Sequence, residues 1–211
     1  MARKKRIWYP GAFYHVMSRG NHRNVIFREH EDYIYFLRVI QILREKYAFR
    51  IHTLCLMTNH FHMILETSDV EIWKIMQKLL SLYAEEFNYR YDCSGHLFEG
   101  RYTACLIEED SYFLEVSRYI HLNPVKAGMV KKPIDYQYSS YLLFASNTNY
   151  RRDSEMQDLL SGVVDISRIL GVFSNSVQGL SPYERYCSFV EDRMPHEEYE
   201  LRIRTEMKED D

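Results

Sequence analysis

Two histidines, His60 and His62, lie two residues apart in the otherwise apolar stretch MTNHFHMILE at residues 57–66. Successive side chains of a strand alternate between its faces, so both imidazoles share one face and Phe61 points to the other. Neutral imidazole nitrogens are common ligands of divalent cations. Histidines in apolar strands are also frequently structural, so this spacing alone leaves a metal site and a core role open.

A second pair of polar side chains, Tyr119 and Asn123, follows in DSYFLEVSRYIHLNP at residues 110–124. Their i, i+4 spacing places both on one side of a helix, whereas His121 points to a different side and is the weaker ligand candidate. A tyrosine can attack phosphorus as a covalent nucleophile when a cation polarises the phosphate, and an amide oxygen can be a third ligand. Tyr102 and Tyr112 lie nearby, and periodicity does not choose among the three tyrosines.

Hydrophobic spacing and turn residues predict the elements that must position these side chains. We expect strands at residues 12–21, 49–58, 60–66 and 101–107, and helices at residues 30–47, 68–91 and 110–124, the last one ended by Pro124. This order is the split βαβ, ferredoxin-like pattern of the α+β class, an antiparallel sheet with helices on one face. The helix at residues 110–124 is then available to cover the opposite face.

The chain is expected to divide into a first domain at residues 1–141 and a mostly helical, acidic C-terminal extension at residues 142–211. Ser181 and Pro182 form a helix start within the extension. The net charge of −3 conceals an asymmetry between the two parts. Residues 1–152 hold 21 Lys and Arg against 16 Asp and Glu, whereas residues 153–211 hold 6 against 14. The first part is therefore able to attract a polyanion.

The composition is that of a globular protein, with 46% apolar and 27% charged residues among 211. No apolar run approaches the roughly 18 residues of a membrane span, and the basic start MARKKR precedes no apolar signal region. The four cysteines are scattered without CxxC spacing. We therefore expect a cytoplasmic protein with no membrane contact and no cysteine-based zinc site.

Four segments together resemble one known family. His60-Phe61-His62 resembles the HUH motif (His, hydrophobic, His) of single-strand DNA endonucleases. RYIHLNPVKAGMV at residues 118–130 resembles the tyrosine helix of the single-tyrosine branch, specifically the REP-associated tyrosine transposases. FYHVMSRGNHRNVIF at residues 13–27 and the longer stretch at residues 96–130 are similar to the same family, in the same order. The resemblance covers roughly residues 6–145.

This resemblance implies a transposase that cleaves and rejoins single-stranded DNA beside hairpins formed by palindromic repeats. Tyr119 would be the nucleophile, forming a 5′-phosphotyrosine intermediate, and His60, His62 and Asn123 would hold Mg²⁺ or Mn²⁺. In other single-tyrosine transposases the third ligand is often a glutamine one helical turn after the tyrosine, so Asn123 is a departure. The resemblance leaves open a monomer or a homodimer.

Basic and amide side chains interleaved with aromatic residues are candidates for DNA contacts, through phosphates and base stacking. Arg19 and Asn21 rank first, because an Arg-Gly-Asn turn after a strand can bring the backbone close to a ligand. The candidate DNA-binding residues are Arg3, Lys4, Lys5, Arg6, Arg19, Asn21, Arg23, Arg101 and Lys126.

Two alternatives accompany the transposase. A catalytically inactive relative could grip a DNA hairpin as a regulator, although the presence of Tyr119, His60 and His62 favours the enzyme. A structural protein that binds zinc through the HFH stretch lacks a fourth Cys or His at recognisable spacing and ranks last. His15 and His52 lie within strand patterns and are expected to be structural.

Overall fold

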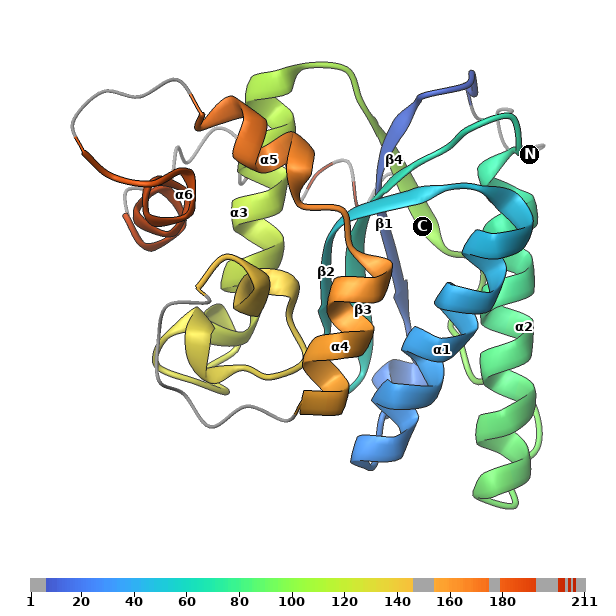
Figure 1. Ribbon diagram of the computed structural model, residues 1–211. Coiled ribbons are helices and arrows are strands. Elements are labelled where there is room, and N and C mark those ends of the chain that lie inside the picture. Colours follow the sequence, from blue (N-terminus) through green and yellow to red (C-terminus); the bar gives the residue numbers. More distant parts are fainter. Residues whose placement is uncertain are drawn as a thin grey trace.

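A four-stranded sheet forms the centre of the molecule. The computed structural model describes residues 7–145, 154–174, 179–192, 201–203, 205 and 207. The strands are β1 (Phe13–Arg19), β2 (Arg50–Leu56), β3 (His60–Glu66) and β4 (Thr103–Ile107), in the spatial order β2-β3-β1-β4. Each neighbouring pair is antiparallel. This order and these directions are those of the split βαβ arrangement, so the predicted α+β class is confirmed (Figure 1).

Helices cover both faces of this sheet. α1 (His30–Tyr47) and α2 (Ile72–Arg90) pack together on one face, whereas α3 (Asp110–Lys126) lies against the other (Figure 1). The alternation of side chains along the strands produces this division. Phe61 and Met63 of β3 belong to the core under α1 and α2, and Ile64 belongs to the core under α3.

The ends of two helices differ from the sequence prediction. α2 begins at Ile72 rather than near Ser68, because the Ser68 hydroxyl shares its proton between Asp69 and the Tyr47 carbonyl in the preceding loop instead of capping the helix. α3 continues through Pro124 to Lys126, so the prediction that this proline ends the helix was wrong. The proline lies in the last turn, where backbone donors from Ala127 and Met129 close the helix end on the carbonyls of Asn123 and Pro124.

The C-terminal extension is helical in its described part. It contains α4 (Ser154–Val163), α5 (Ser167–Val172) and α6 (Pro182–Glu191), after two 3₁₀ turns at Pro133–Asp135 and Ser140–Leu143. α6 begins as predicted, with a capping box between Ser181 and Glu184. Residues 146–153, 175–178, 193–200, 204, 206 and 208–211 fall outside the described residues, and the division at residues 141 and 142 stays a prediction.

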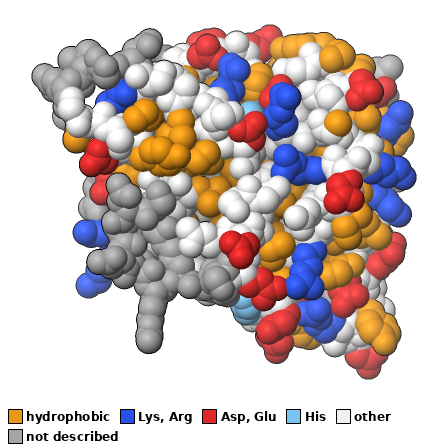
Figure 2. All heavy atoms as spheres, viewed as in Figure 1, with side chains coloured by type: hydrophobic (Ala, Val, Ile, Leu, Met, Phe, Trp, Pro, Cys, Tyr) orange, Lys and Arg blue, Asp and Glu red, His pale blue; other side chains and the backbone are white. Residues whose placement is uncertain are grey.

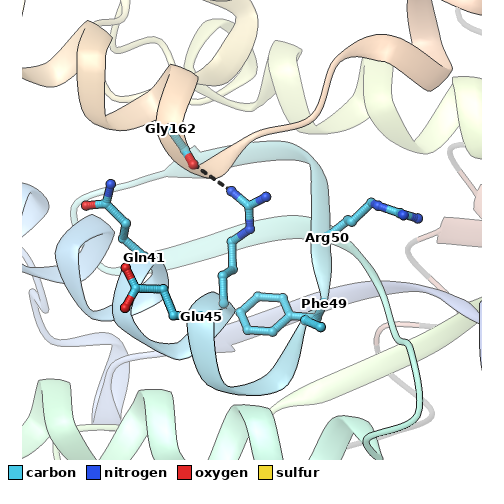
Figure 3. Close-up of a pocket in the computed structure, with 7 residues that line it drawn as sticks. Gln41, Glu45, Phe49, Arg50 and Gly162 are labelled. Atoms are coloured by element: carbon cyan, nitrogen blue, oxygen red, sulfur yellow. Dashed lines mark hydrogen bonds between the residues drawn. The ribbon is translucent and has the colours of Figure 1, made fainter.

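α4 and the residues that follow it pack against α1 and β2. α4 lies on α1, where Arg38 pairs with Glu155 at 2.7 Å. Arg44 donates to the Gly162 carbonyl at 2.6 Å, the hydrogen bond drawn as a dashed line in Figure 3. A cavity of about 410 Å³ remains at this junction. After α4, Val164 pairs with Ile51 on the outer edge of β2, and the Asp165 amide donates to the Ile51 carbonyl at 2.7 Å. Farther along this edge, the Leu56 amide donates to the Tyr138 carbonyl at 3.0 Å.

All four cysteines are free thiols. Among the described helices, none is both long enough and apolar enough to cross a membrane.

Candidate active site

Three histidines meet on the α3 face of the sheet. In the register of the central strands, His60 lies opposite Arg19, His62 opposite Met17, and His15 opposite Ile64. Because alternate residues share a face, His15, Arg19, His60 and His62 all point toward the layer that contains α3. The predicted placement of His60 and His62 on one face is therefore what the strand geometry produces, and β1 adds His15 to them.

Hydrogen bonds orient each of these imidazoles. His60 Nδ1 lies 2.7 Å from Asn59 Oδ1; because an amide oxygen only accepts, this nitrogen carries the proton and Nε2 keeps its lone pair. His62 Nδ1 lies 3.0 Å from His15 Nε2, so one of these two rings donates to the other. Among the residues that the structure describes, the Nε2 atoms of His60 and His62 make no hydrogen bond.

Burial keeps the three imidazoles neutral. It lowers the pKa of His15 to about 3, and burial together with the nearby Arg19 charge lowers the pKa of His60 to about 4. The pKa of His62 lies well below its usual value, through burial and then through the neighbouring His15 and His60. At neutral pH all three therefore carry a nitrogen lone pair, which is the form that binds metals.

Tyr119 of α3 lies directly over this cluster. Its ring centroid is 5.7 Å from that of His62 and 5.9 Å from that of His15. Lys126 Nζ lies 5.1 Å from the Tyr119 centroid on its own helix. Asn123 is partly buried, and its side-chain amide donates to the Tyr119 carbonyl at 3.1 Å, which leaves its oxygen as an acceptor. The phenol, a cation and two open imidazole nitrogens are thus gathered in one place.

These donors fit a divalent cation. The Nε2 atoms of His60 and His62 are uncommitted within the described residues; that of His60 keeps its lone pair, and that of His62 has one when His62 Nδ1 donates to His15. The Asn123 oxygen is available on the same side of α3 as Tyr119. In the described part of the chain, no three His, Cys, Asp or Glu side chains are arranged to hold a metal ion by themselves, so a site here would add the Asn123 amide to two histidines. Nitrogen donors suit Mn²⁺ better than Mg²⁺, whose ligands are mainly oxygens.

The predicted DNA-binding residues fall into separate places. Arg19 is already paired with Glu99, at 2.7 Å, on the rim beside His60. Asn21 and Arg23 form the turn after β1, and Arg101 is exposed in the bend before β4. Arg3, Lys4, Lys5 and Arg6 lie outside the described residues. On the face seen in Figure 2, described basic side chains alternate with acidic ones rather than merging into one patch.

Three neighbours of the site were not singled out from the sequence as members of it. His15, expected to be structural, contacts both His62 and Tyr119; Asn59 holds His60; and Glu99 pairs with Arg19. The available signal was the i, i+2 spacing of His15, Met17 and Arg19 along β1, which places all three on one face of the strand. His52 is structural as expected, because it bonds Glu66 at 2.8 Å and the Asp165 carbonyl at 3.1 Å.

Comparisons with known proteins identify the family of the chain and a similar fold. Residues 9–123 match the family model described as "Transposase IS200 like". The fold is similar to that of a REP-associated tyrosine transposase bound to a REP hairpin, with a TM-score of 0.58 and 18% identity over 86% of this chain and 100% of that one. A protein of Deinococcus radiodurans R1, provisionally named a transposase, shares 15% identity over 56% of this chain and 95% of its own, with a TM-score of 0.40. No curated protein matches the chain.

Proposed function

We propose that this chain, which belongs to the IS200-like transposase family, cleaves and rejoins single-stranded DNA through Tyr119. The family match spans more than half of the sequence and includes every candidate ligand and the candidate nucleophile. The observation that carries the proposal is the position of the Tyr119 ring, 5.7 Å from the His62 ring and beside the uncommitted imidazole nitrogens. A phenol at this place lies next to a site for the phosphate that it would attack.

The reaction would be a transesterification. The Tyr119 oxygen forms a bond to phosphorus and loses its proton, while the bond from phosphorus to the 3′ oxygen of the preceding nucleotide breaks and that oxygen gains a proton. The product is a 5′-phosphotyrosine and a free 3′-hydroxyl. A second 3′-hydroxyl attacking the phosphotyrosine rejoins a strand, so the number of phosphoester bonds is conserved and no external energy source is needed.

His60, His62 and Asn123 would hold Mg²⁺ or Mn²⁺. Such a cation, when bound, polarises the phosphate and keeps it in line with its nucleophile. Asn59 fixes the tautomer of His60, and His15 orients the ring of His62. Lys126 lies over the Tyr119 ring, where its positive charge favours the negative charge that develops on the phenol oxygen.

The substrate we propose is a single strand next to a DNA hairpin formed by a palindromic repeat. Two observations support it: the sequence segments that resemble REP-associated tyrosine transposases, and the similar fold of a member bound to a REP hairpin. The basic excess of residues 1–152 is compatible with a polyanion.

The test uses labelled hairpins with single-stranded flanks, taken from the DNA around the gene, incubated with Mn²⁺ or Mg²⁺. A covalent protein–DNA band on a denaturing gel is expected for the parent and absent for Tyr119→Phe, for His62→Ala, and in chelator. Tyr89→Phe is the matched control, because this tyrosine is 86% exposed on α2 and should leave the band unchanged.

Two results would contradict the proposal. A band that survives Tyr119→Phe would move the nucleophile to another tyrosine. Tight hairpin binding without any covalent band, under all conditions, would instead support an inactive hairpin-binding regulator.

A further inference from the structure

A cavity of about 800 Å³ opens at the end of β1, against the loop at residues 93–97, and we propose that it holds an unpaired nucleobase of the DNA strand. This inference rests on the proposed function and adds a base-binding site to it. The cavity lies between the turn after β1, the end of α2 and the loop at residues 93–97. Its volume falls in the usual range of small-ligand sites, about 300–1,000 Å³.

A short backbone segment connects the lining of this cavity to the strand position opposite His60. Asn21 lines it and stands two residues beyond Arg19, which lies opposite His60 in the sheet. The amide of the intervening Gly20 donates to the Asn59 carbonyl at 2.9 Å, and Asn59 in turn holds His60. Two residues of extended chain span about 7 Å. With about 5 Å between paired strands added, the backbone path from His60 to Asn21 is about 12 Å, which about four stacked nucleotides at 3.4 Å each can span.

The turn that forms one wall has a constrained shape. His22 and Arg23 both adopt positive φ, 52° and 60°, which is unusual for residues with a side chain. Gly20 is required there, because a Cβ at this position would lie 2.0 Å from the Asn24 carbonyl oxygen. Constrained backbone of this kind persists where the surrounding structure holds it, and it is common at ligand sites. The turn therefore presents Asn21 and Asn24 in fixed positions.

The polar lining matches the edge of a base. Within the described residues, the side-chain amides of Asn21 and Asn24 make no hydrogen bond, and both line the cavity. Asn88 donates one hydrogen bond, to the Gly95 carbonyl at 3.1 Å, and keeps its oxygen and second N–H. Each amide offers a donor and an acceptor side by side, which is the pattern that pairs with a nucleobase edge.

A flat platform completes the site. The Arg28 guanidinium lies 4.4 Å from the Tyr91 centroid and 5.1 Å from the Phe87 centroid, so two aromatic rings hold it in place. Arg28, Phe87 and Leu97 all line the cavity, and Val25 at its wall is 44% exposed. Bases stack on aromatic rings and on guanidinium planes, with little dependence on sequence. Stacking on this platform and amide contacts at its side are the two interactions that an unpaired base needs.

The test is an abasic scan of a hairpin oligonucleotide with a single-stranded flank, in which each unpaired nucleotide in turn loses its base. Affinity is measured in the Tyr119→Phe background, so that no covalent product forms. One abasic position is expected to weaken binding about tenfold or more, given the usual contribution of a stacked base. In Asn24→Ala and in Arg28→Met, removing the same base should weaken binding much less, because these variants have already lost contacts to that base.

Gln41→Ala is the matched control, since Gln41 presents a similar amide in the other cavity, at the α1–α4 junction (Figure 3). It should keep the full abasic effect. The proposal is overturned if no abasic position weakens binding. It is also overturned if the abasic position weakens binding by the same factor in Asn24→Ala and Arg28→Met as in Gln41→Ala. The covalent band of the same oligonucleotides, measured with Tyr119 intact, separates the two proposals. If the covalent band forms but the variants do not reduce the abasic effect, the base site alone is rejected. If the variants reduce the abasic effect but no covalent band forms, strand cleavage alone is rejected.

Discussion

α3 borders a buried polar cluster on each of two sides, one built on His15 and His62 of the sheet and one on its own His121, and the two clusters differ in one respect. Toward the sheet, Tyr119 lies over His62 and His15. On another side, His121 Nδ1 lies 2.8 Å from the Tyr186 hydroxyl of α6 and its Nε2 lies 2.8 Å from Ser140 Oγ. Burial lowers the pKa of His121 to about 3, as it does for His15. The residue types and the electrostatics are therefore alike on both sides.

The difference lies in which atoms are already bonded. The His121 cluster is closed: Tyr186 also bonds Ser117 at 3.1 Å, and Ser140 accepts from the Leu54 amide at 2.9 Å. In the other cluster, the Nε2 atoms of His60 and His62 have no hydrogen-bond partner within the described residues. A closed network can only hold the fold together, whereas an open one can bind a ligand. We therefore expect the His121 cluster to contribute to stability and the cluster at Tyr119 to contribute to chemistry.

The largest effect is expected for His62→Ala, which tests whether the open cluster serves chemistry rather than stability. It removes one of the uncommitted nitrogens, so the single-turnover rate of covalent complex formation should fall by about a thousandfold or more. The free energy of unfolding should fall by less than in a variant of the closed cluster, because within the described residues His62 makes one hydrogen bond, to His15, and its Nε2 makes none. Quench-flow gels and urea unfolding measure the two effects; a large loss of stability with normal activity would reverse the assignment.

His121→Ala is expected to give the opposite outcome. The variant loses two buried hydrogen bonds and leaves a cavity, so the free energy of unfolding should fall by about 3 kcal/mol. Below the unfolding transition, the rate of covalent complex formation should stay within a few fold of the parent. Urea midpoints at constant slope test this; an unchanged midpoint would mean that the His121 cluster contributes nothing to stability.

His15→Phe tests the support of the open cluster. The ring volume is nearly kept, but the hydrogen bond to His62 is removed, so Mn²⁺ affinity should fall about 10- to 100-fold. Electron paramagnetic resonance of free Mn²⁺ gives the affinity without using activity. Equal affinity in the parent and the variant would return His15 to the structural role expected from its strand.

The smallest effect is expected for Tyr186→Phe. Only a hydroxyl shared between Ser117 and His121 is lost, and the free energy of unfolding should fall by about 1 kcal/mol. Tyr183→Phe on the same helix is the control, since this residue is 37% exposed and its change should be near zero. A loss of Tyr119-dependent cleavage in Tyr186→Phe, without a change in unfolding, would show that the closed cluster also takes part in the chemistry.

The sequence predicts those parts of the site that depend on a single element. The bounds of α1 at residues 30–47 and of β3 at residues 60–66 agree with the structure, because hydrophobic periodicity and turn residues act locally. For the same reason the sequence places His60 and His62 on one face of their strand, and His121 on another side of α3 than Tyr119.

The rest of the site depends on pairing between distant segments. His15 joins His62 only through the β1–β3 register, and Glu99 reaches Arg19 across 80 residues of chain. The alternation along one strand predicts which face of the sheet each side chain occupies. It does not predict which residue lies opposite, because the register depends on both strands of a pair. The continuation of α3 through Pro124 was missed because a proline usually stops a helix, whereas α3 continues for two more residues and is closed by the Ala127 and Met129 amides.

The outer edge of β2 is occupied by later parts of the same chain, near Ile51 by Asp165 and near Leu56 by Tyr138. A bare edge of a sheet offers unpaired amides and carbonyls to any passing strand, and it is a common starting point for aggregation. The apolar run of β2 would be a poor edge to leave bare. Trimming the chain before residue 154 would uncover the Ile51 end of this edge, so a shortened protein should be less soluble even where its active site is intact.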